Sequence, residues 1–241
     1  MNANYSECLL TEVAWEVCNQ VGGIYTVIRS KVPTMTEVWG DRYCLVGPYF
    51  ANKAIAEFEP IDDYSDVFGQ AVLRMRDLGY EVHFGHWLVS GRPKVVLINH
   101  FSAFYRLGEI KYSLWENHGI SSPEGDDLLN QVIAFGYLTK VFHQQLDIVK
   151  GELPCVTHFH EWMTGTAIPE MRKEHVKTSI VFTTHATMLG RYLAMNDPEF
   201  YDNLPYYDWN KEAINFNIEA AVKIERAAAH GANVFTTVSE V

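Results

Sequence analysis

Short apolar runs alternate along this chain with longer stretches in which apolar residues recur every three or four positions. The short runs predict β-strands, and the longer stretches predict amphipathic helices. The predicted strands are residues 8–14, 43–46, 80–84, 94–99, 155–159, 179–183 and 233–238. The predicted helices are residues 24–38, interrupted at Pro33, and residues 126–146, 164–174 and 216–230.

The helix predicted for residues 126–146 has the clearest pattern. One apolar stripe is formed by Leu128, Val132, Phe135, Leu138 and Phe142. A stripe of this kind packs against a sheet. Strands that alternate with helices through short connections predict an α/β protein, with a mostly parallel, doubly wound sheet and helices on both faces.

The polar, aromatic stretch at residues 196–217 predicts a loop or short helices near the surface. The strand predicted for residues 233–238 is apolar, and in a doubly wound sheet a covering helix is expected to follow such a strand. Only three residues come after it, so we expect this sequence to be a fragment cut between two domains.

The composition fits a packed globular protein and limits its partners. The chain has 241 residues, of which 48% are hydrophobic, and this length suits one large α/β domain. Its formal net charge is -11. A general nucleic-acid surface needs an excess of lysine and arginine, so this charge argues against one, although a local cationic pocket for a phosphorylated ligand remains compatible with it.

The cysteines and the N-terminus indicate a cytoplasmic protein. Cys8, Cys18, Cys44 and Cys155 form no C-x-x-C pair and fit buried free thiols in a reducing compartment. The first residues lack the basic and apolar regions of a secretory signal. No apolar run reaches the length of a membrane span.

Ligands of open α/β sheets bind beyond the carboxyl ends of the strands, so the polar residues that follow each strand are the candidate binding residues. Gln20, Gly22 and Gly23 follow the first strand, ahead of a helix. Paired glycines there let backbone N–H groups approach a phosphate, although by themselves they are better explained by a tight strand–helix turn. The sequence has neither a dinucleotide fingerprint nor a P-loop at this position.

The strand at 155–159 leads into His158, His160, Glu161 and Trp162. Because side chains alternate along a strand, both histidines are expected on one face and Phe159 on the other. This group fits a sugar or metal site, and a buried histidine pair without a ligand is the alternative.

The strand at 179–183 is followed by His185 and, six residues later, by Arg191. A guanidinium binds phosphate through two hydrogen bonds and stabilises charge that develops on it. Three candidate groups at strand ends together favour a binding site over isolated surface residues.

Several segments of the chain, in order along its whole length, resemble glycogen synthases of the animal and fungal type. They are EVAWEVCN (12–19), VGGIYTV (21–27), WGD (39–41), LVGPY (45–49), HFHEW (158–162), FTTHAT (182–187), LGRYL (189–193), ERAAAH (225–230) and FTTVS (235–239). The starch synthases of bacteria and plants, which open with a Lys-x-Gly-Gly-Leu pattern, are less similar.

The resemblance implies the N-terminal, Rossmann-like half of a GT-B glycosyltransferase, spanning residues 1–241. The implied reaction is a retaining transfer of glucose from UDP-glucose to the non-reducing end of an α-1,4-glucan, without a metal or other cofactor. His185 and Arg191 are expected beside the donor glucose and phosphates, with Gly22 and Gly23 in the phosphate-facing loop. The C-terminal nucleotide-binding domain is expected to be absent from this chain, which alone should be inactive.

One position departs from the family pattern. The family usually has a basic residue just before Val-Gly-Gly, and this chain has Gln20. Either another cation serves the diphosphate or the donor contact is weaker. His158, His160, Glu161 and Trp162 are placed at the acceptor side or behind the donor contacts, with Glu161 as a solvated or helix-capping residue.

Two other classes of function stay open on the sequence. His158, His160 and His185 are zinc or iron ligand types, as in a metal-dependent hydrolase. A non-catalytic glucan-binding module is the second. The sequence leaves open the nucleotide preference, the regulation and homo-oligomer formation, and it predicts neither a nucleic-acid nor a membrane partner.

Overall fold

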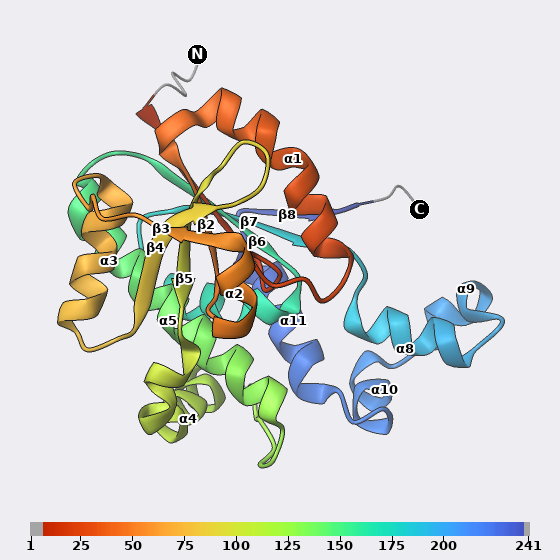
Figure 1. The fold of residues 1–241 in the computed structure, drawn as a ribbon. Helices are drawn as coiled ribbons and strands as arrows, with labels where there is room; N and C mark the ends of the chain where they lie inside the picture. Colours follow the sequence, from red (N-terminus) through yellow and green to blue (C-terminus); the bar gives the residue numbers. More distant parts are fainter. Residues whose placement is uncertain (1–6, 239–241) are drawn as a thin grey trace.

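The computed structural model describes residues 7–238 as one eight-stranded sheet with helices packed against it (Figure 1). The strands are β1 (Leu9–Val13), β2 (Tyr43–Pro48), β3 (Phe58–Pro60), β4 (Val82–Trp87), β5 (Lys94–Ile98), β6 (Cys155–His160), β7 (Ser179–Thr184) and β8 (Val234–Thr237). The helices are α1 (Gly23–Trp39), α2 (Ala51–Glu57), α3 (Val67–Asp77), α4 (Leu107–His118), α5 (Asp127–Lys150), α6 (Trp162–Gly165), α7 (Ala167–Lys173), α8 (Met188–Asn196), α9 (Phe200–Asn203), α10 (Trp209–Asn215) and α11 (Glu219–Gly231).

The sheet is mostly parallel, as predicted. Its strand order is β3-β4-β5-β2-β1-β6-β7-β8. Six strands that are neighbours in the sheet, β5, β2, β1, β6, β7 and β8, pair in parallel. Strand β4 pairs antiparallel with both β3 and β5. The α/β fold class with helices on both faces is therefore confirmed, and β1 lies in the middle of the sheet, between β2 and β6.

Alternate residues of the central strands feed two separate cores. Leu9 and Val13 of β1 belong to the larger core, which β1 shares with α3, α4, α5, α7 and α11. Leu10 and Ala14 belong to the smaller core, which packs against α1 and α2. The period of two along β1 thus sends one set of side chains to each face of the sheet. Glu12 lies on the α1 face, opposite the larger core.

Several element boundaries differ from the sequence prediction. Helix α1 runs through Pro33 without interruption. A proline inside a helix removes one hydrogen bond, but Tyr25, Ile28 and Val32 are buried against the sheet and keep the helix in place. Strand β4 starts later than predicted and continues through Gly85 to Trp87.

Other differences concern helices and the end of the chain. Leu128 does not complete the predicted stripe of α5, because its side chain is exposed in the first turn while the other four are buried. The predicted helix at 164–174 is divided into α6 and α7, and residues 196–217 form short helices that extend beyond the sheet (Figure 1). Strand β8 forms one edge of the sheet, where Val234 and Phe235 are about half exposed. All four cysteines are buried and free, as expected.

The close approach of α5 to the α6–α7 turn gives a test of the packing. A Cβ atom added to Gly136 would overlap Thr166 Oγ1 and lie 2.7 Å from Thr166 Cβ and 3.0 Å from Ala167 N. The neighbouring atoms are backbone and a short, hydrogen-bonded side chain, so they have little room to move. We expect Gly136→Ala to lower the free energy of unfolding by about 1–3 kcal/mol, measured by urea denaturation.

Gly108→Ala in α4 is the matched control. Gly108 is exposed, and an added Cβ would contact nothing within 4 Å. Replacing this helical glycine is expected to leave stability unchanged or to raise it by up to about 1 kcal/mol. Equal stability of the Gly136→Ala variant and the wild type would contradict the close packing of α5 against α7.

Candidate active site

The candidate site lies at the carboxyl ends of β1, β6 and β7, which are neighbours in the sheet. Glu12 comes from β1, His158 and His160 from β6, and His185 and Arg191 from the segment after β7. The parallel pairing places Glu12 beside His158 and His160 beside Thr183. The sheet therefore brings together residues that are about 150 positions apart in the chain.

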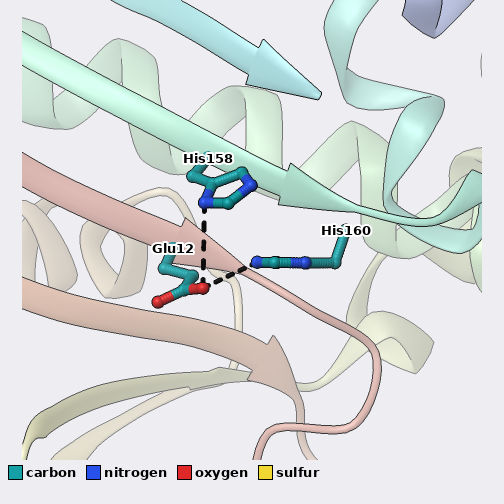
Figure 2. A group of neighbouring side chains, drawn as sticks. All are labelled: Glu12, His158 and His160. Atoms are coloured by element: carbon teal, nitrogen blue, oxygen red, sulfur yellow. Dashed lines mark hydrogen bonds and ion pairs between the residues drawn. The ribbon is translucent and has the colours of Figure 1, made fainter. Parts of the chain in front are cut away.

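A buried carboxylate organises this edge (Figure 2). Glu12 is 1% exposed, and its Oε1 lies 2.6 Å from His160 Nε2 and 3.9 Å from His158 Nδ1. Lys31 of α1 forms an ion pair with the same oxygen. Tyr43 of β2 donates its hydroxyl to Glu12 Oε2 at 2.5 Å. Each carboxylate oxygen thus has at least one partner.

These partners keep Glu12 ionised. Burial by itself would raise the pKa of the Glu12 carboxyl, but the hydrogen bond from His160 and the ammonium of Lys31 hold the pKa well below its ordinary value. Burial and the Glu12 carboxylate raise the pKa of Tyr43 far above its ordinary value, so the phenol stays protonated and donates. A charge with so little solvent contact is tolerated because it is paired and hydrogen-bonded.

His158 and His160 point to the same face of β6, as predicted, and their ring centroids are 4.1 Å apart. His158 Nε2 lies 2.7 Å from Thr183 Oγ1, which in turn lies 2.6 Å from Thr236 Oγ1. Burial and the neighbouring His160 lower the pKa of His158 to about 3. His158 is therefore a neutral, hydrogen-bonded ring at physiological pH.

The three histidines named as metal ligands are not the set that the structure brings together. Among the described residues, Glu12, His158 and His160 offer ligand atoms within 4.8 Å of one another, and His185 lies outside this group. A cation there would have to displace the Lys31 ammonium and the His160 N–H from Glu12 Oε1. A lysine that already occupies the carboxylate makes this group a poor fit for a divalent metal.

His185 extends the network toward the surface. Its Nε2 lies 3.2 Å from His160 Nδ1, and its side chain is partly exposed. Burial, together with the positive charges nearby, lowers the pKa of His185 to about 4. The ring is neutral at physiological pH and offers one N–H and one lone pair.

Glu161 corrects an expectation, because it is neither solvated nor a side-chain helix cap. It is 9% exposed, and its carboxylate makes no capping bond to α6. A positive φ of 65° directs the chain so that Oε1 accepts hydrogen bonds from the backbone N–H groups of His185, at 2.7 Å, and Ala186, at 3.3 Å. Glu161 therefore ties the end of β6 to the loop after β7.

Arg191 lies over this junction. Its side chain is 52% exposed, with Nη2 3.6 Å from Glu161 Oε1 and Nε donating to the Ala186 carbonyl at 3.1 Å. It borders a pocket of about 90 Å³, which is lined by Trp15, Glu16, Ile24, His160, Glu161, Trp162, Met163 and Arg191. The guanidinium is held at one end and has free access to a ligand at the other.

The glycine turn has an acidic partner that was not predicted from the sequence. Glu16 Oε2 accepts from the backbone N–H of Gly22 at 2.7 Å and of Tyr25 at 3.0 Å. A Cβ atom on Gly22 would lie 3.1 Å from Glu16 Oε1, whereas one on Gly23 would contact nothing within 4 Å. A carboxylate thus binds the start of α1, and Gln20 beside it is exposed.

Four polar residues at the site were not predicted from the sequence: the buried Glu12, Tyr43 and Glu225, and the partly exposed Lys31. Glu12 interrupts an otherwise apolar strand, and that interruption was an available signal. Glu225 of α11 accepts from the Thr184 hydroxyl at 3.1 Å and from Met188 N at 3.0 Å, so it supports the loop that carries His185. Nothing in the spacing of Lys31 or Tyr43 indicated their role.

The comparison with family models decides the assignment. The glycogen synthase model matches residues 12–241. The chain belongs to the glycogen synthase family. It is 41% identical over 233 residues to the glycogen (starch) synthase of Neurospora crassa, covering 97% of this chain and 33% of the relative.

Animal members of the glycogen synthase family are equally similar. The liver glycogen (starch) synthase of Rattus norvegicus is 40% identical over 235 residues, covering 98% of this chain and 33% of the relative. The chain thus spans about a third of the length of the curated relatives that it matches.

Among solved structures, the catalytic domain of starch synthase IV from Arabidopsis thaliana, bound to ADP and acarbose, is 19% identical with a TM-score of 0.45. The match covers 74% of this chain and 34% of that chain. Among the described residues of this glycogen synthase family member, no helix has the length and hydropathy to span a bilayer.

The neutral state of His158 predicts a pH dependence of stability. Its pKa of about 3 in the folded chain lies below that of an unfolded histidine, near 6.5. The unfolded state therefore binds more protons below pH 6.5, and the free energy of unfolding falls as the pH falls toward 3. Between pH 7 and pH 5, we expect this residue to account for a loss of about 1–2 kcal/mol.

His158→Gln should remove that loss, since glutamine is not ionised and can still bond Thr183. Urea denaturation at pH 7 and pH 5 measures the change. His230→Gln, on the exposed face of α11, is the control and should keep the wild-type dependence. The same dependence in His158→Gln as in the wild type would rule out a neutral His158.

Proposed function

We propose that this chain is the donor-side part of a glycogen synthase, which transfers glucose with retention from UDP-glucose to the non-reducing end of an α-1,4-glucan. The observation that carries the proposal is identity of about 40% to fungal and animal glycogen synthases over nearly the whole chain. The site geometry supports it, because the residues expected at the donor meet at the carboxyl ends of three adjacent strands.

Arg191 is proposed to bind the diphosphate of the donor. As the bond from glucose to the diphosphate breaks, negative charge accumulates on the leaving group. A guanidinium that meets this charge stabilises the transition state more than the ground state, and this difference accelerates the reaction. Its half-exposed position, anchored by Glu161 and the Ala186 carbonyl, supports this role.

His185 is proposed to position the donor glucose through a hydroxyl group rather than to transfer a proton. A ring with a pKa of about 4 is unprotonated and uncharged at neutral pH, so it can form hydrogen bonds but has no acidic proton to give. Trp162 and His158 lie deeper, so they are proposed to support the donor contacts. The α-1,4-glucan acceptor is proposed to bind to residues outside this group.

The glycine turn is proposed to face the donor phosphates through Gly23, where open space adjoins the start of α1. The Glu16 carboxylate already holds the N–H groups of Gly22 and Tyr25. A phosphate would therefore approach beside Glu16, and the neutral Gln20 leaves Arg191 as the principal cation.

The curated relatives are about three times as long as this chain. We therefore propose that the site is completed by a C-terminal nucleotide-binding domain, in the GT-B arrangement with the active site between two domains. The proposal includes a cytoplasmic location and catalysis without a metal or other cofactor. The Lys31–Glu12 ion pair supports the second point, since it neutralises the buried Glu12 carboxylate that contacts His160.

Replacement of Arg191 tests the proposed mechanism. In the full-length enzyme, Arg191→Ala should lower kcat/KM for UDP-glucose by roughly 10²-fold or more, by analogy with the loss of one oxyanion donor. Arg74→Ala is the control, because Arg74 is an exposed arginine of α3 that contacts Gln145. Transfer rates from radiolabelled UDP-glucose to glycogen measure both variants, and wild-type turnover of Arg191→Ala would remove this residue from the mechanism.

A second test compares the isolated chain with the full-length enzyme. We expect the isolated chain to incorporate little or no glucose into glycogen, because it lacks the proposed C-terminal domain that holds the nucleotide of the donor. Titration with UDP-glucose and with maltooligosaccharides by calorimetry accompanies the assay. Glucan binding with no response to UDP-glucose in the full-length protein would favour a glucan-binding module over a synthase.

A further inference from the structure

We infer that Glu225 is a positioning residue for the transfer reaction: its buried carboxylate fixes the start of α8 to the end of β7 and thereby places Arg191. Glu225 is 7% exposed and belongs to α11, outside the strand ends that form the candidate site. It acts through Arg191, which contacts the donor in the proposed function, and the inference rests on that assignment.

The Glu225 carboxylate joins the two ends of the loop between β7 and α8. Its Oε1 accepts from the hydroxyl of Thr184, the last residue of β7, at 3.1 Å. Its Oε2 accepts from the backbone N–H of Met188, the first residue of α8, at 3.0 Å. Thr184 is 2% exposed, so its hydroxyl has little access to water as an alternative partner. The loop therefore begins and ends on one side chain.

Helix α8 belongs to a segment, residues 188–217, that extends beyond the sheet (Figure 1). Met188 and Leu189 pack against a small core formed by residues of α10 and the start of α11, and Met188 also reaches the larger core of the sheet. Apolar contacts of this kind hold α8 in place but have no preferred direction. The two hydrogen bonds of Glu225 supply the direction in which α8 leaves the sheet.

Protein groups already bind the start of α8. A helix leaves its first backbone N–H groups without a partner inside the helix, and a phosphate often binds there. In α8 the N–H of Met188 donates to Glu225, and that of Gly190 donates to Thr187 Oγ1 at 3.1 Å. Little of the helix start is left for a phosphate, so α8 is expected to meet the diphosphate through the Arg191 side chain. The direction of α8 then sets where that side chain lies.

The hydrogen bonds of Glu225 form in either protonation state. Burial raises the pKa of its carboxyl, and the bonds from Met188 and Thr184 only partly oppose this effect. The ionised carboxylate accepts both bonds. With a proton on Oε1 it donates to the Thr184 hydroxyl and still accepts from the Met188 N–H through Oε2. The side chain therefore contributes its position more than its charge.

Two conservative variants of the full-length enzyme separate position from charge. Glu225→Gln can keep both hydrogen bonds without a charge, whereas Glu225→Asp keeps the carboxylate on a side chain that is shorter by one methylene. We expect kcat/KM for UDP-glucose to stay within about threefold of the wild type in Glu225→Gln. In Glu225→Asp it should fall roughly 10²-fold, with a raised KM, because a displacement of about 1 Å has a cost of this order. The reverse order, or equal values for the two variants, would overturn the inference.

Glu170→Asp is the control for a merely structural role. Glu170 of α7 is also a buried carboxylate, at 9% exposed, and it contacts His118 and Ser113 away from the candidate site. This variant should keep the wild-type kcat and KM, even where urea denaturation shows a loss of stability like that of Glu225→Asp. A rise in KM for UDP-glucose in both variants would overturn the inference.

A double-mutant cycle tests whether Glu225 acts through Arg191. In the Arg191→Ala background, Glu225→Asp should lower kcat/KM by no more than about a further threefold, because the group that Glu225 positions is already absent. The full loss seen in the wild-type background would mean that Glu225 acts on the reaction by another route, and the inference would fall.

Hydrogen exchange, followed by mass spectrometry of the full-length protein without ligand, tests the attachment of α8 independently of activity. Backbone amides of α8 should exchange at least about tenfold faster in Glu225→Asp than in the wild type, while those of α5 stay unchanged. Unchanged exchange in α8 of an enzyme that transfers glucose would overturn the inference and leave the proposed function standing. Faster exchange in a protein without transfer from UDP-glucose would overturn the proposed function and, with it, the role of Glu225 in the reaction.

Discussion

The buried carboxylate of Glu12 is the constraint on which the site depends. A charge in the middle of a sheet needs partners on every side, and here they come from β2, α1 and β6 through Tyr43, Lys31 and His160. Their contacts fix how these three elements approach one another. Because the carboxylate accepts all of these bonds, it also fixes the proton positions of its neighbours. The hydrogen bonds around Glu12, on the α1 face of the sheet, therefore all run toward the carboxylate.

The same constraint separates the two faces of the sheet. On the opposite face, Leu9, Val13 and Phe159 join an apolar core with α5, where packing alone orders the chain. On the α1 face, the strand ends are held together mainly by an ion pair and hydrogen bonds. A second carboxylate, Glu161, ties β6 to the loop after β7, and Arg191 adjoins it. The rigid core positions the strands, and the carboxylates position the groups that meet the ligand.

The fold class was predictable because helical and strand periodicities are local properties. The parallel strands β1, β2, β6 and β7 and the long helix α5 were all recognised from apolar patterns. The antiparallel pairing of β4 with β5 was not predicted, because an apolar pattern shows that a segment is a strand but not in which direction it pairs. Pro33 was expected to interrupt α1, yet burial of Tyr25, Ile28 and Val32 before it outweighs the hydrogen bond that proline removes. Helices α2, α3 and α4 received no prediction.

The sequence by itself determined an α/β fold, free buried cysteines, and the positions of His158, His160, His185 and Arg191 at strand ends, together with the family to which they belong. Only the tertiary structure decided that Glu12 and Lys31 form an ion pair beneath the histidines, and that Glu161 binds backbone N–H groups instead of capping a helix. The reason is physical. Apolar periodicity records which face of an element is buried, whereas the partner of a buried charge is chosen by strand order and register across the sheet.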